Sequence, residues 1–301
     1  MSLKTIAQAA AAMFCVGTLA AVSAVIGDYP LYGGQAMRYG VAAVILVVVA
    51  HARGLRLMRI SGRETVLLVA LALTGLVLFN VCVIEGTRES GAPLVGTVVG
   101  TLPLALAVLA PLTSGRQTIS PRVLAAAIVV VTGATLVTGF GTGTLTGLLW
   151  SIGALACEVC FSLLALPLLP KLGAIRVSAY SAAIAVPLLI VAGLIADGSG
   201  LIRPPTLAEA LSLAYLAVII TSIAFLLWYS AMPRLGPDRA GLFAGLVPVG
   251  AIVTTMALGR GVPSAADFAG TAVVIAGILI GLKPVRGASP ASADARYRPD
   301  A

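Results

Sequence analysis

A pattern of glycines and one proline in the first half of the chain occurs a second time near its end. The segments Gly91–Gly139 and Gly236–Gly281 align at a constant offset of 145 positions. At this offset the coinciding residues are Gly91 with Gly236, Gly96 with Gly241, Gly100 with Gly245 and Pro103 with Pro248; after a loop that is one residue shorter, Ser120 coincides with Ser264 and Gly133 with Gly277. Glycine is common here, at 33 of 301 residues, but three spaced glycines and a proline in one register indicate a duplicated unit.

The composition requires that most of this duplicated chain contacts lipid. Hydrophobic residues make up 59% of the chain and charged residues 10%, with a mean hydropathy of +1.08, whereas a soluble domain is nearer half apolar and a quarter charged. A stretch of about 17–25 apolar residues spans a bilayer as a helix. Such stretches are Ile6–Ile26, Gly33–Ala50, Glu64–Ile84, Ala92–Thr113, Pro121–Gly139, Leu145–Leu169, Arg176–Ala196, Leu207–Met232, Arg239–Leu258 and Ala265–Leu282. The sequence therefore predicts an all-α polytopic membrane protein with ten transmembrane helices.

Basic residues in the connecting loops predict the orientation of these helices. When the N terminus is placed in the cytoplasm, only Arg88, Arg203 and Arg260 fall on the outer side, Arg38 lies within the second span, and the other 15 of the 19 Lys and Arg residues lie inside. Cytoplasmic loops carry such an excess, so both termini are predicted to be cytoplasmic and the protein to lie in the cell inner (plasma) membrane. Binding to nucleic acid is not expected, although the formal charge is +8, because no basic stripe with interleaved aromatic residues occurs.

The first apolar stretch also has the outline of a signal peptide, with Lys4 before it and Val22-Ser23-Ala24 near its end. However, the apolar core of a signal peptide is about 7–15 residues long, and Ile6–Ile26 is long enough to cross the bilayer. We therefore expect it to be retained as the first transmembrane helix.

Each half of the chain contains five spans, and because five is odd the second half enters the membrane from the opposite face. We therefore predict two inverted repeats, 1–139 and 140–282, followed by a disordered cytoplasmic tail over 283–301 that is rich in Pro, Ala, Ser and charge. Inverted repeats are the architecture of secondary transporters, which hold substrate near the bilayer midplane at the repeat interface. Two equivalent halves can exchange conformations and so open one site to either side in turn.

The layout resembles a known family. Ten spans in two sets of five, Arg38 early in the second span, and a repeated Gly-x3-Gly-x2-Pro before a loop and a Gly-rich helix are similar to the drug/metabolite transporter superfamily, EamA type. The resemblance covers Ile6–Leu282 and implies two EamA-like units and export of amino acids or other small metabolites. The family often has an acidic residue after the fourth and ninth helices. Because this chain has Ser114-Gly115-Arg116 and Gly259-Arg260-Gly261 there, a gate built on those acids is not expected.

Glu158 is the strongest candidate for a functional side chain. It lies in Leu145–Leu169 near the expected bilayer centre, where a charge costs roughly 2.5–3.5 kcal/mol on insertion scales. Burial favours the neutral carboxyl, so Glu158 would hold a proton when the site is empty and release it to a cationic ligand. The alternative is a neutral Glu158 that bonds a backbone carbonyl or Ser162. The run from Gly153 to Val159 also resembles the first helix of small multidrug resistance proteins, whose glutamate binds protons and cations alternately.

The other polar candidates have two interpretations each. Arg38 lies about one and a half turns into the second span and would either face the cavity and bind a carboxylate or extend to the outer headgroups. Asn80, Thr97 and Thr101 would line the cavity or bond neighbouring helices together. Trp228 and Tyr229, near the inner end of the eighth span, would form part of an aromatic belt or stack on substrate.

The coinciding glycines and prolines predict where helices approach and bend. The pairs Gly96/Gly100 and Gly241/Gly245 permit close helix contact. Pro103 and Pro248 each remove one backbone hydrogen bond and leave a free carbonyl one turn earlier. We expect these elements to line the site and bend during transport, or alternatively to serve packing alone.

An enzyme is not expected, because the single histidine, His51, lies in a basic loop and no acids pair within the spans. Neither a metal nor a cofactor is predicted, since the four cysteines, Cys15, Cys82, Cys157 and Cys160, all fall in apolar spans and read as buried hydrophobes. The expected partners are a small-molecule substrate and the bilayer. The sequence thus predicts a secondary transporter, an exporter of amino acids or similar metabolites, in which Glu158 binds an ammonium or a proton and Arg38 a carboxylate. The alternative is proton-coupled efflux of lipophilic cations, which needs Glu158 alone.

Overall fold

The computed structural model describes residues 2–56, 58–113, 119–139, 141–259 and 262–283. Arg116, Arg260 and the predicted tail beyond Lys283 lie outside the described residues, as do parts of the loops that follow the fourth and ninth spans. Within the described ranges the chain contains helices and no strand.

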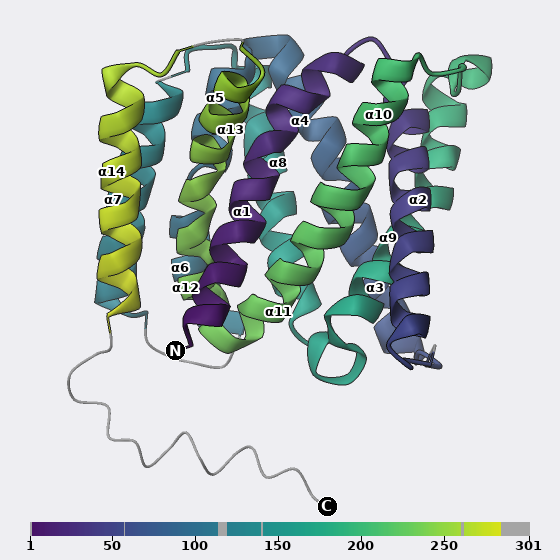
Figure 1. Cartoon of the computed structure of the whole chain (residues 1–301), viewed down its shortest axis with the longest axis horizontal. Coiled ribbons are helices and arrows are strands. Elements are labelled where there is room, and N and C mark those ends of the chain that lie inside the picture. Colours follow the sequence, from purple (N-terminus) through teal and green to yellow (C-terminus); the bar gives the residue numbers. More distant parts are fainter. Residues whose placement is uncertain (1, 57, 114–118, 140, 260–261, 284–301) are drawn as a thin grey trace, which may run out of the picture.

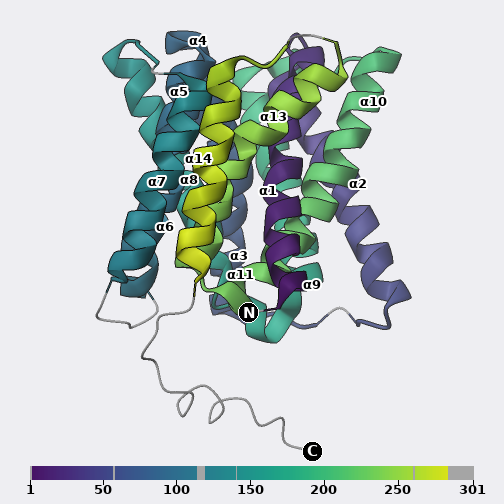
Figure 2. The same cartoon turned by 60° about the vertical axis from the view of Figure 1, so that its left-hand side comes forward.

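The helices cross one slab and run alternately up and down (Figures 1 and 2). Their bounds, grouped by predicted span, are α1 (Leu3–Ser23); α2 (Leu31–Ala52); α3 (Gly62–Ala72), η2 (Leu73–Leu78) and α4 (Phe79–Ser90); α5 (Ala92–Val99) and α6 (Leu102–Thr113); α7 (Pro121–Thr138); α8 (Leu145–Ala165); α9 (Leu169–Ala196); α10 (Leu207–Tyr215), η4 (Leu216–Ala224) and α11 (Phe225–Leu235); α12 (Pro237–Gly241), η5 (Leu242–Gly245) and α13 (Leu246–Ala257); and α14 (Ala265–Leu282). Short 3-10 turns η1 (Ala24–Ile26) and η3 (Gly198–Gly200) follow α1 and α9. We call the face where α1 begins and α14 ends the lower face, and the opposite one the upper face (Figure 1).

Helix length and hydropathy confirm the predicted all-α polytopic membrane fold. Nine helical stretches of the described chain are long and apolar enough to span a membrane, and α1 contributes a shorter apolar stretch, Leu3–Leu19. The main difference in bounds is at α9, which begins at Leu169 and not at Arg176. Gly173 adopts the non-helical angles φ +71° and ψ 166° within it, so a kink at this glycine separates residues 169–172 from the long part of α9.

The third and eighth spans share local features at the offset of 145. Ser61 and Glu64 form a capping box at the start of α3, and Thr206 and Glu209 form one at the start of α10. Such a box satisfies the free N–H groups of the first turn. Each span then contains a π-helical segment, η2 in one and η4 in the other. These correspondences support the proposal that residues 1–139 and 140–282 are related units.

The helix pairs also correspond when the two predicted halves are exchanged. The fifth and tenth spans pack together as α7 and α14, and the second and seventh as α2 and α9. The packing of α1 on α13 corresponds to that of α8 on α5, and the packing of α8 on α4 to that of α1 on α11. At the α7–α14 contact, a Cβ atom on Gly133 would lie 2.7 Å from the Gly270 carbonyl oxygen, so the two backbones approach as closely as glycine allows.

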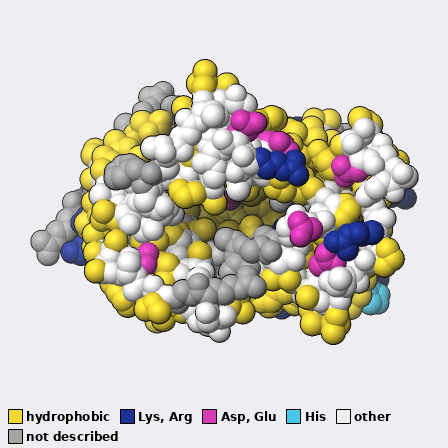
Figure 3. Space-filling view, turned by 90° about the horizontal axis from the view of Figure 1, so that it is seen from above, with side chains coloured by type: hydrophobic (Ala, Val, Ile, Leu, Met, Phe, Trp, Pro, Cys, Tyr) yellow, Lys and Arg dark blue, Asp and Glu magenta, His cyan; other side chains and the backbone are white. Residues whose placement is uncertain are grey.

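The upper face is hollowed, whereas the interior below it is packed. Seen from above, the hollow has a hydrophobic lining, with charged side chains near its rim (Figure 3). Towards the lower face, Leu102 and Leu106 of α6 form a buried apolar cluster with Val159 of α8. Leu106 also packs on Gly241, where a Cβ atom would lie 2.9 Å from Leu106 Cδ1. The chain is therefore open on one face and closed by apolar packing on the other.

Candidate functional site

Glu158 lies in the second half of α8, and no described residue neutralises its charge. Its side chain makes neither a hydrogen bond nor an ion pair with any described residue, and it is partly exposed. Ser162, one turn further along, is buried and its Oγ likewise has no hydrogen-bond partner in the described chain. The predicted alternative in which Glu158 bonds Ser162 is therefore not what the structure contains. A carboxyl in this position is available to a ligand or a proton.

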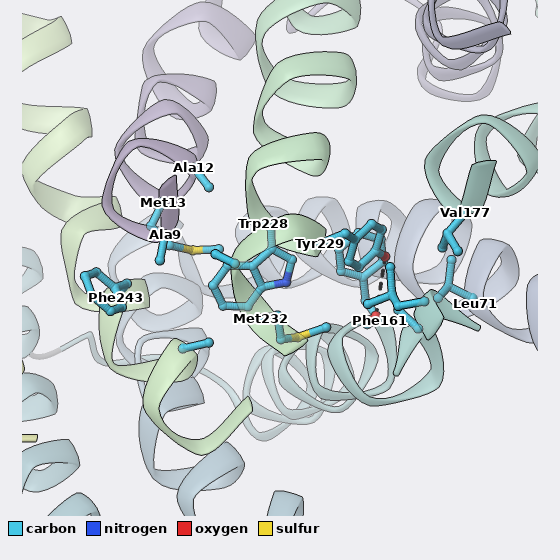
Figure 4. Packing of buried hydrophobic residues seen from close by; sticks show 14 of the residues in the cluster. Ala9, Ala12, Met13, Leu71, Phe161, Val177, Trp228, Tyr229, Met232 and Phe243 are labelled. Carbon is cyan, nitrogen blue, oxygen red and sulfur yellow. Dashed lines mark hydrogen bonds between the residues drawn. The ribbon is translucent and has the colours of Figure 1, made fainter. Parts of the chain in front are cut away.

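Aromatic side chains pack beside this carboxyl. The ring of Phe161 lies 5.0 Å from that of Phe225 and 5.3 Å from that of Tyr229, measured between centroids. The hydroxyl of Tyr229 donates to the Phe161 carbonyl oxygen at 3.5 Å (Figure 4). Tyr229 also lies within range of direct electrostatic interaction with Glu158. The wall next to Glu158 is thus apolar and aromatic, which strengthens any charge interaction there.

Trp228 and Tyr229 face the protein interior and not lipid. They are 2% and 1% exposed. Trp228 points towards Ala9 and Met13 of α1, while Tyr229 points towards Phe161 of α8 (Figure 4). The structure therefore excludes the aromatic-belt interpretation for both, and it places Tyr229, but not Trp228, beside Glu158.

Arg38 is directed into the bundle. It is 4% exposed, and its Nε donates to Thr221 Oγ1 at 2.8 Å and its Nη1 to Gln35 Oε1 at 3.2 Å. The guanidinium carbon lies 5.0 Å from the centroid of the Tyr39 ring. The alternative in which Arg38 extends to the headgroups is therefore wrong. No described Asp or Glu lies within ion-pair distance of it, so its positive charge is met by neutral groups only.

Asn80 connects the Arg38 region to the third span. Its Nδ2 donates to the hydroxyl oxygen of Tyr39 at 3.2 Å and to the Leu76 carbonyl oxygen at 2.8 Å. Arg38, Tyr39 and Asn80 consequently form one connected polar group that involves α2, η4 and α4. Glu158 is not a hydrogen-bond partner of this group, and it is not among the groups that act electrostatically on Arg38.

Thr97 and Thr101 are occupied by backbone contacts. Thr97 Oγ1 contacts the carbonyl oxygens of Pro93 and Gly139, each at 2.8 Å, and so connects α5 to the end of α7. Thr101 Oγ1 donates to the Val98 carbonyl oxygen at 2.7 Å. The structure thus favours the predicted role of Thr97 in holding helices together, and neither threonine hydrogen-bonds Glu158 in the described chain.

The coinciding glycines and prolines lie at interruptions of the fourth and ninth spans. The fourth span is divided between α5 and α6 at Gly100, just before Pro103, and the ninth passes through the 3-10 segment η5, which ends three residues before Pro248. Gly241 and Gly245 are tightly enclosed, Gly241 by Leu106 and Gly245 by valines of α7 and α14. A Cβ atom on Gly96 would meet only Thr138 at 3.7 Å. The ninth-span glycines are therefore required for packing, whereas Gly96 has space around it.

Sequence reasoning missed four side chains of this region: Gln35, Tyr39, Thr221 and Phe225. The adjacent Thr221 and Ser222 carried a usable signal, because two hydroxyls interrupt an otherwise apolar stretch. No comparable signal marks Tyr39 or Phe225, whose importance depends on contacts with distant segments.

The upper rim carries a charged contact above α2. The guanidinium of Arg203 donates to Glu209 Oε2 at 3.0 Å and lies 4.8 Å from the Tyr29 ring centroid, and Tyr29 donates to the Arg203 carbonyl oxygen at 2.6 Å. The hydrogen bond with Glu209 raises the pKa of Arg203.

Within the described chain no group of three His, Cys, Asp or Glu residues could hold a metal ion.

Comparisons with known proteins agree with the fold and the predicted family. Residues 145–282 match the EamA-like transporter family. The uncharacterized transporter YetK of Bacillus subtilis (strain 168) is 24% identical over 279 residues, which cover 90% of this chain and 84% of that protein. A solved crystal structure of 19% identity has a TM-score of 0.77 and covers 94% of this chain and 97% of its own. The last comparison concerns the fold alone, while the first two support the drug/metabolite transporter superfamily.

Proposed function

We propose that this chain is a transporter of the drug/metabolite type, a secondary active transporter that exports amino acids or similar small metabolites; the match of its second half to the EamA-like transporter family and its similarity to a transporter over most of its length support this proposal. The substrate binds in the interior between Glu158 and Arg38. Glu158 binds the ammonium group, or a proton when the site is empty, and Arg38 binds the carboxylate.

The observation that supports this proposal is a pair of interior charges of opposite sign, neither of which has a charged partner in the described chain. A charge within a membrane segment is costly, and such residues pair with one another or mark substrate and proton pathways. A zwitterion supplies one counter-charge to each. Because Arg38 and Glu158 are on separate helices and do not interact with each other, a ligand can lie between them.

Alternating access is the proposed mechanism. The hollow is open at the upper face, and the cluster of Leu102, Leu106 and Val159 closes the lower one. In the opposite state the lower contact between Leu106 and Gly241 opens, and the upper parts of the fourth and ninth spans approach. The interruptions before Pro103 and Pro248 allow the two parts of each span to move separately. Because the two repeats are inverted copies, an exchange of their conformations turns an outward-open state into an inward-open state around the same site.

The lower face is proposed to be cytoplasmic, in the cell inner membrane. Basic residues of the described loops lie mainly at the ends of helices on this face, including Arg53, Arg56, Lys171 and Arg234. Excess Lys and Arg mark cytoplasmic loops. Both termini are then inside, and the hollow opens to the outside.

Efflux of lipophilic cations is the second candidate, because Arg38 is already bonded to Thr221 and Gln35 and is 4% exposed. In this alternative Arg38 is structural, and only Glu158 and its aromatic neighbours contact the substrate.

A flux assay on Arg38→Ala separates the two candidates. Purified protein in liposomes is supplied with a mixed amino-acid pool and one lipophilic cation under a pH gradient. If the wild type moves an amino acid and Arg38→Ala loses that flux, the zwitterion assignment stands. If the wild type moves the lipophilic cation and Arg38→Ala retains that flux, the cation assignment replaces it. Movement of neither solute contradicts both.

A further inference from the structure

The end of α2 at the lower face is closed by a tight turn that folds the chain back towards the helix (Figure 1). Gly54 adopts φ +69°, and its N–H donates to the His51 carbonyl oxygen at 2.9 Å. The N–H of Leu55 donates to the Ala50 carbonyl oxygen, also at 2.9 Å. These two bonds form a Schellman motif, which requires a left-handed residue that is usually glycine. The motif sets Leu55 beside the last turn of α2.

Contacts with α9 hold the chain that follows this turn. Arg176 Nε donates to the Arg56 carbonyl oxygen at 2.9 Å. The Tyr180 hydroxyl accepts from the Met58 N–H at 3.0 Å and donates to the Met58 carbonyl oxygen at 3.2 Å. Both contacts use backbone atoms of the loop, so they fix its path and leave the side chain of Arg56 exposed.

A pocket of about 680 Å³ lies between this loop and the last turns of α2. Apolar side chains line most of it, and its two polar side chains are His51 and Arg56. Both are exposed, and neither side chain forms a hydrogen bond or an ion pair with a described residue. The pocket therefore combines an apolar lining with two N–H donor groups that are free for a ligand.

The pocket continues into an exposed stripe on α2. Its members recur every three or four residues, which places them on one side of the helix: Val41, Val44, Val48 and His51. Other sides of α2 pack on α9 and η4. From Val41 to His51 the helix rises about 15 Å, which is half of the roughly 30 Å hydrocarbon thickness of a bilayer. An acyl chain along this stripe would thus bring its headgroup to the level of His51.

The loop around the pocket carries an excess of positive charge. Glu64 is the only acid among residues 51–64, and it is paired with Lys171. Three further arginines of the loop are exposed and none is ion-paired within the described ranges: Arg53, Arg59 and Arg63. Clusters of Lys and Arg beside the end of a transmembrane helix attract anionic lipid headgroups.

We infer that the lower end of α2 is a binding site for an anionic phospholipid. The guanidinium of Arg56 binds the headgroup phosphate, for which its planar fork is suited, and His51 donates a further hydrogen bond. One acyl chain lies in the apolar part of the pocket and along the valine stripe. This site goes beyond the proposed function, since it lies on the outer side of α2 and does not depend on which solute is carried.

The test measures which lipids remain bound to the full chain in detergent, by native mass spectrometry with equal amounts of dioleoyl phosphatidylglycerol and dioleoyl phosphatidylcholine. The wild type is expected to retain the anionic lipid roughly fivefold more than the zwitterionic one. Arg56→Gln should lose most of this preference. Arg63→Gln is the matched control, because it removes the same charge from the same loop but does not line the pocket, and it should keep the preference.

Three results would overturn the inference. Equal retention of the two lipids by the wild type would show that no anionic site exists, whatever the variants do. Equal losses in Arg56→Gln and Arg63→Gln would indicate diffuse attraction by the whole loop. Retention of dihexanoyl phosphatidylglycerol equal to that of the dioleoyl lipid would show that the headgroup binds without the stripe. Thermal unfolding verifies that each variant is folded, and none of these results alters the flux expected for Arg38→Ala.

Discussion

Thr221 is the side chain that holds Arg38 in the interior, and its replacement by valine gives a calculable effect. Thr221 Oγ1 accepts from Arg38 Nε at 2.8 Å and donates to the Leu216 carbonyl oxygen at 3.1 Å, and the residue is fully buried. Thr221→Val removes both bonds at nearly constant volume. A hydrogen bond to a charged group contributes about 1.5–3 kcal/mol and a neutral one about 0.5–1.5 kcal/mol, so the free energy of unfolding should fall by about 2–4.5 kcal/mol.

Ser222→Ala is the control, because Ser222 is also buried in η4 and donates to the Ala217 carbonyl oxygen at 2.9 Å but makes no hydrogen bond with Arg38. It should cost only about 0.5–1.5 kcal/mol. The assay is denaturant unfolding in mixed micelles, with Arg38→Met and the double variant completing a mutant cycle. Equal losses for Thr221→Val and Ser222→Ala, together with additive behaviour in the cycle, would refute the reasoning that Thr221 supports a buried charge.

Two further predictions concern packing and orientation. Gly133→Leu should force α7 and α14 apart, because even a Cβ atom would lie 2.7 Å from the Gly270 carbonyl oxygen. We expect the free energy of unfolding to fall by about 1–3 kcal/mol, measured by thermal unfolding. An unchanged melting temperature would contradict the close contact. In a background without native cysteines, Arg56→Cys should react with a membrane-impermeant maleimide only in inside-out vesicles and Arg88→Cys only in right-side-out cells. Reversed or two-sided labelling would contradict the proposed orientation.

Features that depend on neighbouring residues in the sequence were predicted well. The apolar runs gave the helices, since a stretch such as Pro121–Gly139 can satisfy its backbone in lipid only as a helix, and Gly139 and Gly236 mark helix ends because each adopts positive φ. The span that forms α9 was predicted to begin at Arg176, with Lys171 in the loop before it. Lys171 lies instead in the short helical stretch before the kink at Gly173, where its Nζ is 2.7 Å from Glu64 Oε1.

Features that depend on which side of a helix faces inwards were not predictable in the same way. The spans are apolar on nearly all sides, so periodicity does not distinguish a lipid-facing surface from an interior one. Arg38 could therefore extend outwards or inwards on the sequence alone, and only its contact with Thr221, 183 positions away, decides between them. The burial of Trp228 and the link from Tyr39 to Asn80 depend in the same way on contacts between distant segments.

The role of Glu158 is the central claim, and proteoliposome flux under an imposed pH gradient tests it most directly. Wild type, Glu158→Gln and the control Glu64→Gln are compared, because Glu64 is the acid of an ion pair with Lys171 at the lower face. The account predicts gradient-driven solute movement in the wild type and in Glu64→Gln, and its loss in Glu158→Gln. Equal flux in all three proteins would contradict the account, since Glu158 would then take part neither in substrate binding nor in coupling to protons.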